Sequence, residues 1–180
     1  SARPYQPAGY YAHLNFPPRR YFYDEDENQY RRGVYTHWQR QFLHPMLRAF
    51  DAPTREECTV RRTISNTPTA ALTLLNDPTF VEAARVLAVR VLEQEGDDAS
   101  RIRWLWREVL SRTARSEEVA VLANLLSANR STYEGDEVAA AELLEVGLAP
   151  APADVPAIEL ASWTAVCRAI LSLNETITRN

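Results

Sequence analysis

The residue types that could do chemistry are concentrated between Tyr30 and Asp77, where arginine, carboxylate and histidine residues occur at high density along the sequence. Guanidinium groups are planar and can donate two hydrogen bonds at once to a carboxylate, sulfate or phosphate, so clustered arginines predict an anion-binding site. The candidates are Arg31, Arg32, Arg40, Arg61 and Arg62. His37 and Asp51 are the candidate catalytic residues, and His37 would move a proton if it met Asp51 and Arg61 around an open cleft.

The same residues also have a structural interpretation, which we favour. Arginines beside Asp51, Glu56 and Glu57 can pair with these carboxylates and with loop carbonyls, and so hold irregular backbone together. His44 lies seven residues after His37, too far for a pair of metal ligands one helical turn apart. We therefore expect no metal site and no cofactor in this chain, and we expect that the isolated domain is not catalytic.

Composition excludes several classes of function. All 20 basic residues are arginines, which excludes lysine chemistry such as Schiff-base formation. The 5 glycines are at least twelve residues apart, whereas loops that cradle phosphates need glycines within a few residues of each other. The net charge of −4, with arginines interleaved among acids, disfavours nucleic acid as a partner. No apolar run approaches the length of a membrane span.

Two further groups of residues have simple interpretations. Cys58 and Cys167 are too few and too far apart for a zinc framework, so we expect two buried free thiols. A single disulfide is the alternative, and it would matter in an exported protein. The acidic run from Asp24 to Glu27 is predicted to be a solvated loop, since it lacks the spaced ligands of a calcium loop, although calcium is the alternative.

The chain has two parts of different composition. Residues 1–66 are rich in proline and aromatic residues, and each proline removes a backbone donor and favours extended geometry before it. We expect this part to be irregular, with one helix near 35–48 that Pro45 interrupts. Disordered segments are poor in aromatic residues, so the part should be ordered and should pack on another surface. We expect it to form one domain with residues 67–180.

Residues 67–180 have the apolar periodicity of helices. Asp77 followed by Pro78 predicts one helix start, Asp97 or Asp98 a second, Ser116 a third and Asp136 a fourth. A last helix is predicted over 157–173, after a linker of prolines and alanines. No alternating strand pattern of useful length occurs. The sequence therefore predicts an all-α fold, a bundle of about five to six helices that carries a long, ordered, aromatic N-terminal segment.

Several longer strings resemble the planctomycete PSD-one family, a domain of unknown function (1553). They lie at residues 1–9, 30–40, 50–62, 66–68 and 74–85, and in the sequence E-L-A-S-W-T that begins at Glu159. The sequence departs from the family pattern at residues 69–71 and 172–175. The family's biochemistry is unassigned, so the resemblance implies no activity.

What the resemblance implies is a context for the chain. It implies the C-terminal part of a large exported protein, periplasmic or at the cell surface. Such proteins often carry a cytochrome-c-like module upstream, so haem c would belong to an upstream domain and not to this chain. The start at Ser1 rather than Met fits this expectation.

These observations leave two main hypotheses of function. The first is a structural or interaction domain that docks on upstream domains of the same polypeptide and helps to shape a shared site. It predicts an exposed aromatic patch of Tyr10, Tyr11, Tyr21, Phe22 and Tyr23. The second is an enzyme domain or binding module that acts on an anionic polysaccharide, or on a redox substrate linked to the cytochrome module. It would use the arginine cluster and His37.

Overall fold

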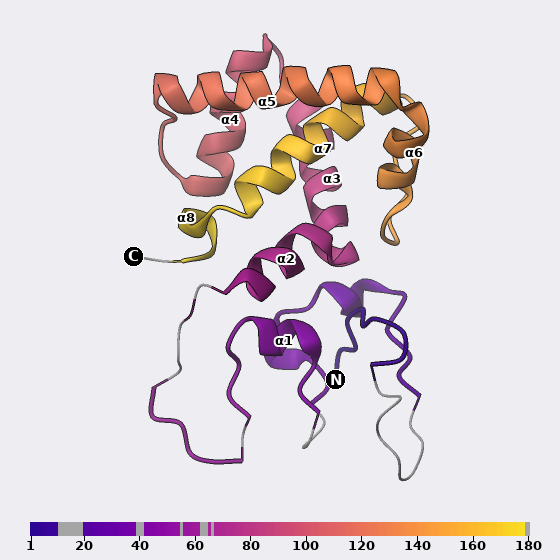
Figure 1. Cartoon of the computed structure of the whole chain (residues 1–180), viewed down its shortest axis with the longest axis vertical. Helices are drawn as coiled ribbons and strands as arrows, with labels where there is room; N and C mark the ends of the chain where they lie inside the picture. The colour runs from indigo at the N-terminus through magenta and orange to yellow at the C-terminus, as the bar shows by residue number, and fades with distance from the viewer. Residues whose placement is uncertain (11–19, 39–41, 55, 62–64, 66, 179–180) are drawn as a thin grey trace. The chain divides into compact units, whose positions relative to one another are not determined.

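The structure, a computed structural model, describes residues 1–10, 20–38, 42–54, 56–61, 65 and 67–178 of the 180-residue chain. It divides into two compact units, Ser1–Thr73 and Leu74–Asn180 (Figure 1). The boundary falls inside helix α2 (Pro68–Asn76), a few residues after the change in composition predicted at residue 66. That the two units form one domain stays a prediction.

Backbone hydrogen bonds between distant segments hold the N-terminal unit together. The N–H of Ala2 donates to the Tyr35 carbonyl at 2.8 Å, and the Ala2 carbonyl accepts from the N–H of His37 at 2.6 Å. The N–H of Asp24 donates to the Arg3 carbonyl at 2.8 Å, while the N–H of Arg3 donates to the Asp24 carboxylate at 2.7 Å. The first residues are thus fixed beside two later segments, as an ordered irregular segment requires.

The helices of this unit are short, and the predicted helix near 35–48 is wrong in its extent. The unit contains the 3₁₀ helices η1 (Glu27–Tyr30) and η2 (Gly33–Tyr35) and the α-helix α1 (Pro45–Ala49). The described residues between η2 and α1 are not helical. Pro45 begins the helix instead of interrupting it, because a proline forces the residue before it out of helical geometry. His44 accordingly has ψ 135° and caps α1 by accepting from the N–H of Met46 at 3.3 Å.

The C-terminal unit is a helical bundle, which confirms the predicted all-α fold. After α2 follow α3 (Pro78–Leu92), α4 (Asp98–Leu110), α5 (Ser116–Gly135), α6 (Glu137–Glu145), α7 (Ala157–Leu171) and α8 (Asn174–Ile177). The described residues contain an isolated bridge between Ala2 and Thr36 but no strand. None of their helices combines the length and the apolar character that crossing a membrane would require.

Helix α7 lies in the middle of this unit and packs against α3, α5 and α6 (Figure 1). Its side chains are buried around most of the helix, including Trp163, Val166 and Ile170, none of which is exposed. Ser162 and Thr164 are also fully buried, and each hydroxyl donates at 2.7 Å to a carbonyl one turn earlier, Ile158 and Leu160 respectively. The core of the unit is therefore built around α7.

Local capping explains where the helices begin. Asp77, Asp97 and Asp136 each accept a hydrogen bond at 2.9 Å from an N–H in the first turn of the helix that follows, as predicted. The prediction that Ser116 caps α5 is wrong by one position, since Arg115 is the capping residue and Ser116 the first helical one. The carboxylate of Glu118 accepts from the N–H of Arg115 at 2.7 Å and completes the cap.

Two arginines join the helices at the two ends of α5, and each binds a pair of carboxylates. Near its end, Arg130 pairs with Asp98 of α4 and with Glu159 of α7, which also accepts from the indole of Trp163 at 2.9 Å. Near its start, Arg112 pairs with Glu118 at 2.8 Å and with Glu175 of α8 at 2.6 Å. These ion pairs fix α5 relative to α4, α7 and α8.

Replacing Arg130 should make the free energy of unfolding of the C-terminal unit vary less with pH in the acidic range. Hydrogen bonds from Arg130 hold the pKa of Asp98 and of Glu159 below their ordinary values. A carboxylate whose pKa is lowered in the folded state stabilises the fold above its unfolded pKa, and this stabilisation is lost as the pH falls through the folded pKa. We expect Arg130→Ala to lower the free energy of unfolding by about 1 kcal/mol at pH 7 and by less at pH 3, measured by urea denaturation.

Arg107→Ala is the matched control, since Arg107 is an exposed arginine of α4 with no ion pair in the described part of the chain. It should change the free energy of unfolding little at either pH. An equal loss for Arg130→Ala at pH 7 and pH 3 would contradict the role given to the ion pairs.

Candidate functional site

The two candidate catalytic residues make contacts with different segments of the N-terminal unit. His37 is half-buried, and its Nδ1 lies 3.4 Å from the hydroxyl of Ser1. Asp51 has a positive φ of 55°, and its carboxylate accepts from the N–H and the hydroxyl of Ser65 at 2.7 and 2.6 Å. The contacts of Asp51 join residues 51 and 65, which are fourteen positions apart in the sequence. That arginines pair with Asp51, Glu56 and Glu57 to hold these loops stays a prediction. A catalytic pair of His37 and Asp51 stays a prediction.

The predicted anion cluster is only partly within the described residues. Arg40 and Arg62 lie outside them, while Arg31, Arg32 and Arg61 are exposed. The guanidinium carbon of Arg31 lies 5.9 Å from the centre of the Tyr35 ring, and Arg32 precedes η2 as its capping residue. Arg31 and Tyr35 therefore form an exposed cation–π pair on the N-terminal unit.

The aromatic side chains of this unit differ from the predicted patch. Tyr11 lies outside the described residues. Tyr10 and Tyr21 are half-buried and donate to the carbonyls of Leu43 and Pro4 at 3.4 and 2.7 Å. Phe22 and Tyr23 are exposed as predicted, at 66% and 39%. The exposed aromatic residues also include two that the sequence did not single out, Tyr30 and Tyr35.

His44 is a buried polar residue whose environment the sequence did not reveal. It is 2% exposed, its ring lies 6.0 Å from that of Tyr21, and its Nε2 has no hydrogen-bond partner among the described residues. Burial lowers the pKa of His44 from its ordinary value, which favours the neutral form of the ring. The dipeptide His44-Pro45, a capping residue before a proline, is the sequence signal that could have placed this histidine at a helix start.

Two carboxylates of the acidic run from Asp24 to Glu27 bind backbone N–H groups. Asp24 binds the N–H of Arg3, and Asp26 caps η1 by accepting from the N–H of Asn28 at 2.9 Å. The described residues contain no cluster of histidine, cysteine and carboxylate side chains arranged to hold a metal ion. The contacts of the run are thus those of a structural loop.

Two buried charged residues of α3, Glu82 and Arg85, bind the backbone of the connection between α6 and α7. Glu82 and Arg85 are 3% and 2% exposed. Glu82 accepts from the N–H groups of Leu148 and Ala149 at 2.7 and 3.0 Å, while Arg85 donates to the carbonyls of Leu144 and Ala149. The pair therefore fastens the connection between α6 and α7 to α3. We call this arrangement the Glu82–Arg85 clamp.

Gly147 is the position in this connection where no side chain fits. Its φ is +99°, a conformation that other residues rarely adopt. A Cβ added there would collide with the carboxylate of Glu82 and would stand 2.7 Å from its Cβ. The backbone of the connection can thus approach Glu82 because residue 147 is glycine.

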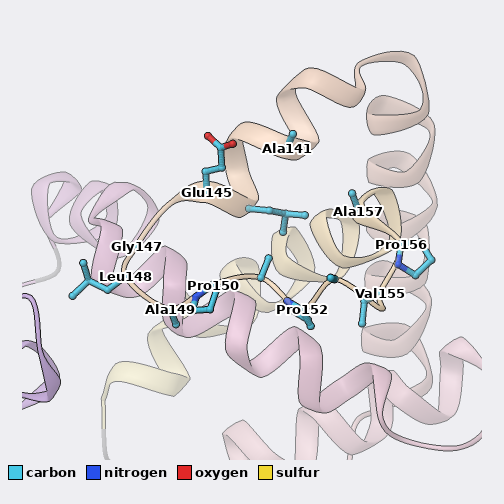
Figure 2. Close-up of a pocket in the computed structure, with 13 residues that line it drawn as sticks. Ala141, Glu145, Gly147, Leu148, Ala149, Pro150, Pro152, Val155, Pro156 and Ala157 are labelled. Carbon is cyan, nitrogen blue, oxygen red and sulfur yellow. The ribbon is translucent and has the colours of Figure 1, made fainter.

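Beside the clamp the connection forms an open hollow of about 730 Å³. Figure 2 shows Ala141 and Glu145 of α6 on one side and Pro152 and Val155 on the other. Prolines and alanines make up most of its walls, and Glu145 is the one charged residue among the residues that line it. With a single charged side chain, this hollow lacks the convergent polar groups of a catalytic centre.

The two cysteines are free, but only one of them is buried as predicted. Cys58 is exposed, and Cys167 is fully buried in α7. Burial raises the pKa of the Cys167 thiol above its ordinary value, which suppresses the reactive thiolate. The structure thus contains one accessible and one inert thiol.

Labelling with DTNB should distinguish the two thiols. We expect one thiol per chain to react rapidly in the folded protein and the second only after unfolding in guanidinium chloride, since the reagent needs an accessible thiolate. Cys58→Ser should abolish the rapid reaction. Rapid reaction of both thiols would contradict the burial of Cys167.

Substitution of Gly147 should destabilise the C-terminal unit through the clamp. Gly147→Ala combines an unfavourable φ with a collision against Glu82, so we expect the free energy of unfolding to fall by about 2 kcal/mol or more in urea denaturation. Gly135→Ala is the matched control, because Gly135 has no positive φ and a Cβ there meets nothing within 4 Å. A control that loses as much as Gly147→Ala would contradict this explanation.

The comparisons with known proteins identify a family but no activity. The model of the PSD1 family, described as a protein of unknown function (DUF1553), matches residues 1–126 of the 180-residue chain. This stretch includes the N-terminal unit and both residues of the Glu82–Arg85 clamp. The searches of curated proteins and of solved structures found no match. Because the match spans well over half of its length, the chain belongs to the PSD1 (DUF1553) family of proteins of unknown function.

Proposed function

We propose that this chain is an interaction domain of a larger exported protein and that its N-terminal unit docks on upstream domains of the same polypeptide. The observation that carries this proposal is the exposure of aromatic side chains. Within the described residues, all four exposed aromatic side chains belong to the N-terminal unit: Phe22, Tyr23, Tyr30 and Tyr35. Aromatic residues are enriched at protein interfaces, where they bury a large area at a small cost in conformational entropy.

The fixed backbone around these side chains also supports docking. The contacts of Ala2 with Tyr35 and His37, and of Arg3 with Asp24, tie the segments that carry Phe22, Tyr23 and Tyr35 to the first residues of the chain. A preformed surface loses less conformational freedom on binding than a disordered one. Export and a cytochrome-c-like module upstream are part of the proposal, and the family resemblance supports both.

A second candidate function is supported by the exposed pair of Arg31 and Tyr35. An arginine stacked on an exposed ring can bind a sulfate or carboxylate group while the ring packs on a sugar face. This pair supplies the charged and aromatic groups that a binding module for an anionic polysaccharide would use.

The exchange rates of backbone amide hydrogens test whether the N-terminal unit docks on upstream domains. The exchange of residues 20–36 should be slower in the full-length parent protein than in this chain alone, since an interface excludes solvent from the backbone. Phe22→Ser combined with Tyr35→Ser should restore the faster exchange in the parent protein. Val138→Ser is the control, because Val138 of α6 is as exposed as Phe22 (68% and 66%) but lies on the C-terminal unit.

The outcomes separate the two candidates. Equal exchange in the parent protein and in the isolated chain would overturn the docking proposal. Slower exchange on addition of a sulfated oligosaccharide, lost in Arg31→Ala and weakened by salt, would instead support the polysaccharide module.

A further inference from the structure

A second hollow, of about 340 Å³, lies between α4, α5 and the end of α7, within the C-terminal unit. Its floor is formed by the buried residues Trp106, Leu122 and Ile170, while Val121 and Leu173 at its rim remain exposed. The surface that lines it is almost entirely apolar. Its volume is at the lower end of the range of small-molecule sites, which is enough for one ring with a short substituent.

The charged residues at the mouth of this hollow are Glu117 and Glu118, and they differ in their partners. Glu118 binds Arg112 through both oxygens, at 2.8 and 2.9 Å, and this hydrogen bonding lowers its pKa to about 2. Glu117 is an exposed residue in the first turn of α5, and its carboxylate has no ion pair or side-chain hydrogen bond in the part of the chain that the structure describes. Within the described residues, the carboxylate of Glu117 at the mouth therefore has no cationic partner.

Trp106 contributes an aromatic ring to the lining of this hollow. Its side chain is 5% exposed, and its indole nitrogen has no hydrogen-bond partner among the described residues. The guanidinium carbon of Arg112 lies 5.0 Å from the centre of its ring. The indole nitrogen is itself buried, and aromatic rings pack favourably against each other in offset or edge-to-face geometry. This wall therefore favours an aromatic ligand over an aliphatic one.

We propose that this hollow binds a small organic cation, in which an aromatic ring fills the apolar space and an ammonium group pairs with Glu117. The ring gains free energy from burial against Trp106, Leu122 and Ile170. The ammonium group stays at the solvent-exposed mouth, where pairing with a carboxylate requires little desolvation. This inference concerns a site in the C-terminal unit and does not depend on the docking proposed for the N-terminal unit.

Three probes of similar shape and different charge test the proposal: 2-phenylethylammonium, 2-phenylethanol and 3-phenylpropanoate. We expect the ammonium probe to bind with a Kd of ~1 mM, about two- to fivefold tighter than the alcohol, and the carboxylate to bind weakest. Nuclear magnetic resonance measures each Kd, and the indole N–H signal of Trp106, assigned with Trp106→Phe, should shift on binding. High salt should remove the advantage of the ammonium probe.

Two variants separate the contribution of the apolar hollow to probe binding from the contribution of the carboxylate of Glu117. Val121→Trp should fill the hollow and weaken all three probes at least tenfold, and circular dichroism verifies that the variant is folded. Glu117→Gln should make the ammonium and the alcohol probes bind equally. Glu137→Gln is its control, since Glu137 is an exposed glutamate in the first turn of α6.

Other results would overturn the proposal. These are no shift of the Trp106 signal at 20 mM probe, equal affinities of the ammonium and alcohol probes for the unmodified chain, and an ammonium preference that survives in Glu117→Gln. Failure of this test leaves the hydrogen-exchange result for the N-terminal unit unaffected, so the two proposals are separately falsifiable.

Discussion

The C-terminal unit depends on the burial of α7. The helices α3, α4, α5 and α6 all contact α7, and Arg130 of α5 forms an ion pair with Glu159 in its first turn. On the buried faces of a helix, polar side chains need hydrogen-bond partners within the protein, because water cannot reach them. The buried hydroxyls of Ser162 and Thr164 meet this condition by donating to carbonyls of α7 itself. Arg112 and Arg130, which are only partly buried, join the neighbouring helices at the two ends of α5.

The helices of this unit could be predicted because their signals are local. An aspartate before a first turn and an apolar residue at every third or fourth position are properties of one short stretch, and Asp77, Asp97 and Asp136 acted as expected. The helix predicted near 35–48 is too long, because Pro45 holds His44 outside helical geometry and so begins a short helix instead. Aromatic residues predicted an ordered N-terminal segment, but not which rings would be covered.

The site was less predictable because its contacts join distant residues. Glu82 binds backbone groups of Leu148 and Ala149, and nothing in the sequence around Glu82 indicates this pairing. Arg31 and Arg32 are exposed, and the contacts of His37 and Asp51 run to Ser1 and Ser65. Spacing along the chain shows which residues could cooperate, and only the tertiary fold shows which ones meet.

The Glu82–Arg85 clamp divides the connection between α6 and α7 into two parts with different freedom to change during evolution. Residues 144–149 are bound to α3 at four backbone atoms, so their spacing is fixed by the distance between those atoms. Residues 150–155 have no such anchor among the described hydrogen bonds. Related chains should therefore differ in length after Ala149, and that stretch is the place where an inserted peptide tag or loop would leave the bundle intact.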